Sequence, residues 1–153
     1  MSRLSPRVQV QWGLRAIGAA AVLGAIVAIL TYWTGWRDPI LGLPTFAIAG
    51  SLLLVVAHLK YRIWRYDVLE DSLFLHRGVF TRVRTVVPYV RVQHVDTQRN
   101  PIERLLGLSR VVVYTAGSRG ADVSIPGLTN ERAESLQEEL RQLAGEHDTD
   151  DGV

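Results

Sequence analysis

Two long stretches without any charged side chain dominate the first sixty residues of this chain. Residues 16–36 contain no Asp, Glu, Lys or Arg, residues 39–59 contain none either, and each stretch is 21 residues long. At about 1.5 Å per residue, a helix of that length covers the roughly 30 Å hydrocarbon core of a bilayer. Only Arg37 and Asp38 separate the two stretches. The sequence therefore predicts a transmembrane helical hairpin, which we assign to residues 1–60.

Two other interpretations of these stretches are weaker. An amphipathic helix followed by a buried core helix would need a polar face on the first helix, and residues 17–30 show none. A cleaved signal peptide would end in small residues, but the first stretch ends with the bulky run 32–36, YWTGW, and a second apolar stretch follows at once. We therefore expect the first helix to be retained.

Basic residues flank the N-terminal end of the first span and the C-terminal end of the second. Arg3, Arg7 and Arg15 precede the first span, Lys60, Arg62 and Arg65 follow the second, and Arg37 lies between the two. Because cytoplasmic loops carry the excess of Lys and Arg, we expect a two-pass protein of the cell membrane with both termini in the cytoplasm.

Past the second span the pattern changes to that of short strands. Hydrophobic and polar residues alternate from Trp64 to Val68, and strand-like runs follow at 73–79, 81–87, 92–98, 110–115 and 121–125. No long helix separates these runs, which favours antiparallel pairing in a sandwich or barrel. We assign residues 61–145 to this domain.

Two helical segments accompany the strands. Asn100, Pro101 and Glu103 form the start signal of a short helix that ends at Gly107. After Thr129, apolar residues recur at helical spacing through Leu143, which predicts an amphipathic C-terminal helix that packs on the sheet. Residues 146–153 are acidic and lack core residues, so we expect a disordered tail.

Four motifs within the strand region carry a resemblance to a known family. They are VPYVRVQHVD at 87–96, PIERLLGL at 101–108, YTAG at 114–117 and IPGL at 125–128. Together they resemble the bacterial PH-type, membrane-flanked domain family, often called YdbS-like. The resemblance implies a membrane-tethered, pleckstrin-homology-like barrel or sandwich with a C-terminal helix, in a family to which no enzymatic activity is assigned. It also implies a larger relative with several such domains as a candidate partner.

Most catalytic and metal-binding chemistry is missing from the sequence. The chain has no cysteine, its four histidines lack metal-binding spacing, and no nucleophile motif or phosphate loop is present. His94 and Asp96 share a strand face, where we expect them to fix the following turn by hydrogen bonds. A net charge of +2 argues against nucleic acid as a partner. We therefore expect no enzyme, no metal ion and no cofactor.

Local clusters of basic residues are the remaining candidates for a binding site. Arg91, Arg99 and Arg104 surround the short helix and are the candidate docking site for a protein. Asp96 and Glu103 are close enough in sequence to neutralise that cluster. The candidate contacts to lipid headgroups are Lys60, Arg62, Arg65, Arg82 and Arg84. The alternative is that the first three only set the membrane topology and that the strand arginines form an ordinary solvated face.

These clusters leave two functional hypotheses. The first is a membrane-anchored scaffold or assembly protein that docks another membrane protein, or a second copy of itself, at the cytoplasmic face. The second is a module that senses anionic lipid at the inner leaflet. A chain already anchored by two helices has little need of headgroup affinity for recruitment, which favours the first.

Overall fold

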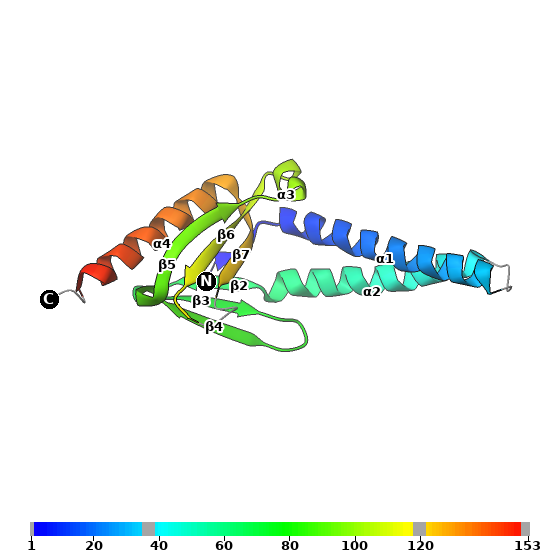
Figure 1. Ribbon diagram of the computed structural model, residues 1–153, viewed down its shortest axis with the longest axis horizontal. Coiled ribbons are helices and arrows are strands. Elements are labelled where there is room, and N and C mark those ends of the chain that lie inside the picture. The colour runs from blue at the N-terminus through cyan, green and yellow to red at the C-terminus, as the bar shows by residue number, and fades with distance from the viewer. Residues whose placement is uncertain (1, 35–38, 118–121, 151–153) are drawn as a thin grey trace. The chain divides into compact units, whose positions relative to one another are not determined.

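The computed structural model describes residues 2–34, 39–117 and 122–150 (Figure 1). Arg37 and Asp38 of the predicted connector and residues 151–153 of the predicted tail lie outside this part of the chain. The chain divides into two compact units. We call Gln9–Arg62 the helical unit, and we call Met1–Val8 together with Ile63–Val153 the β unit.

The helical unit consists of two long apolar helices. They are α1 (Arg7–Trp33), whose first two residues belong to the β unit, and α2 (Gly42–Ile63), which follows the short 3-10 helix η1 (Pro39–Leu41). Both are long and apolar enough to cross a membrane, and only 17% and 11% of their most apolar windows are buried inside the protein. A helix of a soluble core would be mostly buried, so these surfaces are left for lipid.

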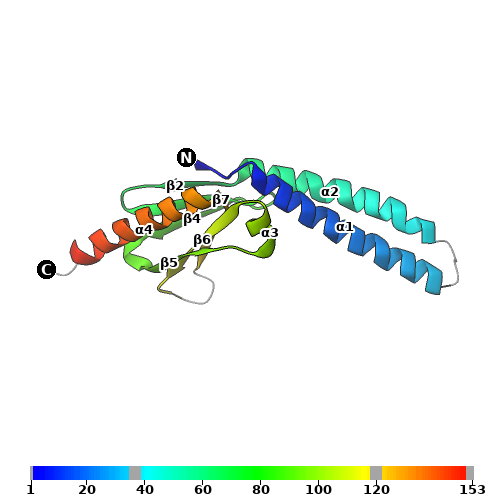
Figure 2. The same cartoon turned by 90° about the horizontal axis from the view of Figure 1, so that it is seen from above.

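Within the helical unit, α1 and α2 lie side by side, as Figure 2 shows from above. A Cβ atom added to Gly24 would lie 2.9 Å from the carbonyl oxygen of Gly42, and one added to Gly42 would lie 2.7 Å from that of Gly24. No side chain fits at these distances, so the two backbones contact each other directly. Nearer the other end of the pair, Lys60 Nζ lies 4.6 Å from the centroid of the Trp12 ring.

The β unit contains two antiparallel sheets in a sandwich-like arrangement. The first has the order β1-β2-β3-β4, and the second has the order β5-β6-β7. A 3-10 turn, η2 (Tyr89–Arg91), connects them. The strands are β1 (Ser2–Arg3), β2 (Arg65–Val68), β3 (Ser72–Arg77), β4 (Val83–Pro88), β5 (Val92–Gln98), β6 (Leu108–Thr115) and β7 (Val123–Thr129). The six predicted strands are thus present, and the fold is PH-like.

The N-terminal residues correct the predicted domain boundary. Ser2 and Arg3 pair with Tyr66 and Arg65 of β2, so residues before α1 belong to the β unit and not to a hairpin of residues 1–60. Ser5 N–H donates to the carbonyl oxygen of Gly127 at 2.8 Å. Two strand residues are too few to show alternation, and their partners lie more than sixty positions later, so the sequence pattern could not reveal this pairing.

The two predicted helices of the β unit are present. They are α3 (Pro101–Leu105) and α4 (Asn130–Asp150), and α4 lies along the second sheet (Figure 1). Ala133, Leu136 and Leu140 of α4 are fully buried there. The helix continues past Gly145, where we expected it to end, through five residues of the predicted tail. Gly145 does not adopt the positive φ that ends a helix at glycine, so it interrupts nothing.

Candidate functional site

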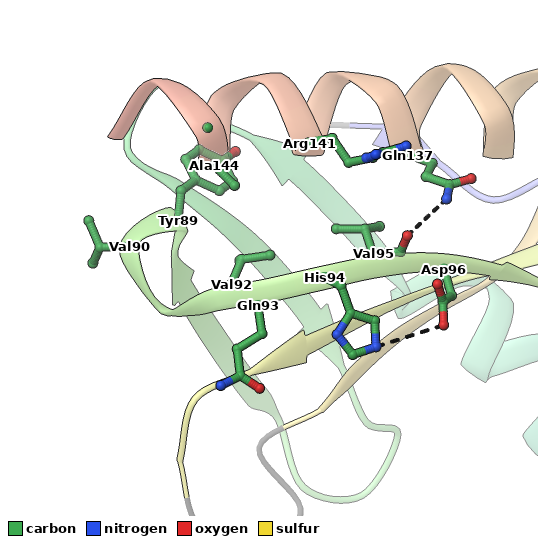
Figure 3. Close-up of a pocket in the computed structure, with 11 residues that line it drawn as sticks. Tyr89, Val90, Val92, Gln93, His94, Val95, Asp96, Gln137, Arg141 and Ala144 are labelled. Atoms are coloured by element: carbon green, nitrogen blue, oxygen red, sulfur yellow. Dashed lines mark hydrogen bonds and ion pairs between the residues drawn. The ribbon is translucent and has the colours of Figure 1, made fainter. Parts of the chain in front are cut away.

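A groove of about 720 Å³ runs between β5 and α4 in the β unit (Figure 3). One wall comes from η2 and the first half of β5, and the other comes from the outer turns of α4. Its lining mixes apolar and polar side chains, with Val90, Val92 and Ala144 beside Gln93, His94 and Arg141. This composition suits the binding of a peptide segment better than the binding of a purely apolar ligand.

The open edge of a β-strand forms one wall of the groove. Because β5 is at the end of the order β5-β6-β7, half of its backbone N–H and C=O groups point away from β6. Gln137 of α4 forms a hydrogen bond with one of these groups, because its Nε2 donates to the carbonyl oxygen of Val95 at 2.8 Å. Thr97 Oγ1 donates to Gln137 Oε1, also at 2.8 Å. This bridge fixes α4 against the strand and keeps the groove formed.

The titratable groups in the groove do not form a catalytic set. His94 Nε2 lies 3.9 Å from Asp96 Oδ2, which is too long for a hydrogen bond, and both side chains are more than half exposed. His94 is therefore not hydrogen-bonded to Asp96, and its ring stacks on Tyr114 with ring centroids 4.2 Å apart. Among the side chains that the structure describes, no three His, Asp or Glu residues are placed to hold a metal ion.

Tyr89 forms part of the lining and is held in the neutral state. It is buried, and its hydroxyl donates to the carbonyl oxygen of Leu69 at 2.9 Å. Burial, and then the negative charges of Glu139 and Asp71, raise the pKa of Tyr89 to about 12. The phenol is therefore a structural hydrogen-bond donor and does not act as a base at neutral pH.

The three arginines expected to form one docking cluster are separated by the fold. Arg91 lies in η2 at one end of β5, and Arg99 follows the other end, so roughly 25 Å of strand lies between them. Arg99 Nη2 pairs with Glu134 Oε1 of α4 at 3.3 Å, and Arg104 is exposed on α3. Arg91 therefore lies beside the groove, whereas Arg99 and Arg104 lie beside α3.

Glu103 is unavailable to neutralise these arginines because it is fully buried. Its carboxylate accepts hydrogen bonds from Arg110 Nη2 at 2.7 Å and from the backbone N–H of Asn100 at 2.9 Å. Asn100 Oδ1 in turn accepts from the backbone N–H of Glu103, which completes the capping box expected from the sequence. The sequence reasoning missed Arg110. The only feature of the sequence that could have indicated the Glu103–Arg110 pair is the arginine itself, which lies within a predicted strand seven residues after Glu103.

The five candidate headgroup contacts fall into the two units. Lys60 and Arg62 belong to α2 in the helical unit. Arg65 is half-buried at the start of β2, where it pairs in register with Arg3 and His76. Arg82 and Arg84 are exposed at the loop and on the edge strand of the β3–β4 hairpin.

Comparison with known proteins agrees with this architecture. A family model described as "Bacterial PH domain" matches residues 9–144, which include both long helices and nearly all of the β unit. The chain is 34% identical, over 157 residues, to the UPF0699 transmembrane protein YdbS of Bacillus subtilis (strain 168), and the alignment covers 97% of this chain and 96% of that protein. No solved structure matches the chain significantly. The chain therefore belongs to the bacterial PH domain family and is a membrane protein of that family.

Proposed function

We propose that this chain is a non-enzymatic, membrane-anchored docking protein. Its PH-like domain holds a segment of another membrane protein, or of a second copy of the chain, at the cytoplasmic face. The observation that carries the proposal is the groove between β5 and α4, one wall of which is an open strand edge. Extended segments bind such edges by adding a strand, because backbone hydrogen bonds supply affinity and adjacent side chains supply specificity.

Contacts within the β unit hold the walls of the groove in place. Gln137 bridges α4 to the edge of β5, and Leu136 and Leu140 anchor the same helix in the core. A site that needs little rearrangement loses less entropy when a segment binds. Arg141 in the groove and Arg91 beside it favour a segment that carries acidic residues.

Sensing of anionic lipid is the second candidate function. The observation in its favour is the exposed pair Arg82 and Arg84 on the β3–β4 hairpin, which together could attract an anionic surface by about 2 kcal/mol. A sensor must respond to lipid composition. Partner retention that changes when anionic lipid is removed from the bilayer would therefore favour this function, and unchanged retention would favour docking.

The test of docking places a bulky side chain in the groove. Gly145 lines it, and a Cβ atom added there meets nothing within 4 Å, so Gly145→Trp introduces its side chain without a clash at Cβ. Gln142→Trp is the matched control, because Gln142 is exposed on the same helix outside the groove. The full chain is purified in mild detergent, and native mass spectrometry identifies a bound membrane protein or a second copy.

Docking predicts that the unchanged chain and Gln142→Trp retain the partner and that Gly145→Trp loses it with an unaltered melting temperature. If both tryptophan variants retain the partner equally, the groove is not the docking site. If the unchanged chain is always monomeric and alone, the proposed function fails.

A further inference from the structure

Two large apolar side chains are far more exposed than the other large apolar side chains that the structure describes in the β unit. Phe80 is 88% exposed and Leu105 is 87% exposed, whereas the next large apolar side chain of the unit, Val90, is 59% exposed. A fully exposed phenylalanine gains about 2 kcal/mol on leaving water. Two such side chains, one on a loop and one on a short helix, would therefore gain free energy if another surface covered them.

Phe80 lies at the end of the first sheet where the chain arrives from α2. Only Trp64 separates the last residue of α2, Ile63, from Arg65, so Arg65 lies within about 8 Å of the helix end. Arg65 pairs with His76 of β3, and the loop that carries Phe80 starts two residues later, at Gly78 with φ of 100°. The strand register therefore places this loop beside Arg65, the second residue after the end of α2 in the chain.

Leu105 lies near the other chain connection, that to α1. It is the last residue of α3, and Gly107 follows it with φ of 64°. A Cβ atom added to Gly107 would lie 3.2 Å from Nη1 of Arg7, the first residue of α1. Figure 1 shows α3 and the β3–β4 loop at the same end of the β unit, which we call the proximal end. The groove lies toward the opposite, distal end.

Positive charge surrounds both apolar tips. Arg77 and Arg82 flank Phe80 in the chain and are exposed, and Arg104 precedes Leu105 and is exposed as well. No Asp or Glu occurs anywhere from residue 72 to residue 95, so the whole β3–β4 hairpin is cationic. An aromatic or aliphatic tip among arginines is the composition that favours the headgroup layer of an anionic leaflet.

We propose that the proximal end of the β unit contacts the bilayer spanned by the chain's own helices, with Phe80 and Leu105 inserted into the interfacial layer and the neighbouring arginines among the headgroups. We choose the bilayer as the surface that binds here because only Trp64 links α2 to β2. A domain tethered so closely to a membrane-spanning helix meets the leaflet at a very high effective concentration. The contact fixes the orientation of the domain and leaves the distal groove open to the cytoplasm.

The absence of cysteine makes the test direct. Single variants Phe80→Cys and Leu105→Cys of the full chain are labelled with an environment-sensitive fluorophore and placed in nanodiscs of phosphatidylcholine and phosphatidylglycerol. Leu69→Cys is the matched control, because Leu69 is exposed outside the groove at the other end of β3, roughly 20 Å from the Phe80 loop. Quenching is measured with aqueous iodide and with lipids that carry a nitroxide at a shallow depth.

The proposal predicts that lipid nitroxide quenches the labels at positions 80 and 105 several-fold more than the label at position 69, and that iodide shows the reverse order. Equal accessibility of all three labels to iodide overturns the proposal. Protection from iodide without quenching by lipid nitroxide also overturns it, because a protein surface then covers the tips. These results do not depend on occupation of the groove, so docking and membrane contact can fail separately.

Discussion

The two ends of the β unit expose different chemistry. At the proximal end, single apolar side chains stand among arginines on a loop and on a five-residue helix. At the distal end, a helix of 21 residues packs along an edge strand and leaves a groove with mixed lining. Isolated tips suit a soft, fluid surface that needs no shape complementarity, whereas a walled groove suits a partner of defined shape. Our two proposals therefore assign a membrane surface to the proximal end and a protein partner to the distal end.

The membrane topology gives the largest expected contrast, because its outcome is all or none. We expect the distal end to face the cytoplasm. Three basic residues precede the first span and three follow the second, whereas only one lies between the spans. Reporter fusions at residue 37 and at the C-terminus should therefore report opposite compartments. A cytoplasmic signal from the fusion at residue 37 would break the comparison, since the groove would then face the wrong side.

Loss of the core contact made by Leu136 should detach α4 and so remove the groove at the distal end. Leu136 is fully buried, so Leu136→Ala is expected to cost about 2 to 5 kcal/mol of folding free energy. Thermal unfolding in detergent would show the loss, and the groove would lose its helical wall. Truncation after Gly145, which lies beyond Leu140, the last buried residue described in α4, serves as the control and should leave the melting temperature nearly unchanged.

The position of α3 at the proximal end depends on the buried carboxylate of Glu103. Glu103→Ala removes the capping box and leaves Arg110 without its carboxylate, and we expect a loss of about 2 to 3 kcal/mol because Arg110 is partly exposed and can be hydrated. Glu134→Ala removes the exposed partner of Arg99 and should cost less than about 1 kcal/mol. Chemical denaturation of the two variants compares them. Equal losses would mean that the buried pair does not hold α3.

Local patterns in the sequence predicted most of the fold. Charge-free runs gave the two helices, alternation gave six strands, and Asn100 with Glu103 gave the capping box. The pairing of Ser2 and Arg3 with β2 and the partnership of Glu103 with Arg110 could not be predicted, because both depend on contacts that bring separate segments together.

The candidate site was harder to predict than the fold. The separation of Arg91 from Arg99 follows from the length of β5, yet their nearness in sequence suggested one cluster. The groove needs both the open edge of β5 and the position of α4, and neither is visible in a residue pattern. Exposed tips such as Phe80 and Leu105 look like core residues in a sequence, since hydrophobicity alone does not tell which face of a loop or short helix is covered.

The smallest expected effect concerns Tyr89 at the groove. The folded chain keeps the phenolic proton up to a pKa of about 12, against an ordinary value of 10.0, so the folded state binds more protons than the unfolded state between these pH values. Stability should therefore fall as the pH rises from about 10 to 12. Tyr89→Phe should remove this dependence and cost about 1 kcal/mol through the lost hydrogen bond to Leu69. Parallel melting curves across this pH range measure both effects.

Photo-crosslinking in native membranes tests the division between the two ends most directly. A diazirine amino acid is introduced at Gln93 in the groove or at Phe80 in the loop, both of which are exposed. After illumination, the adducts are identified by mass. Our account predicts protein adducts at position 93 and phospholipid adducts at position 80. Protein adducts at position 80, or phospholipid adducts at position 93, would contradict it.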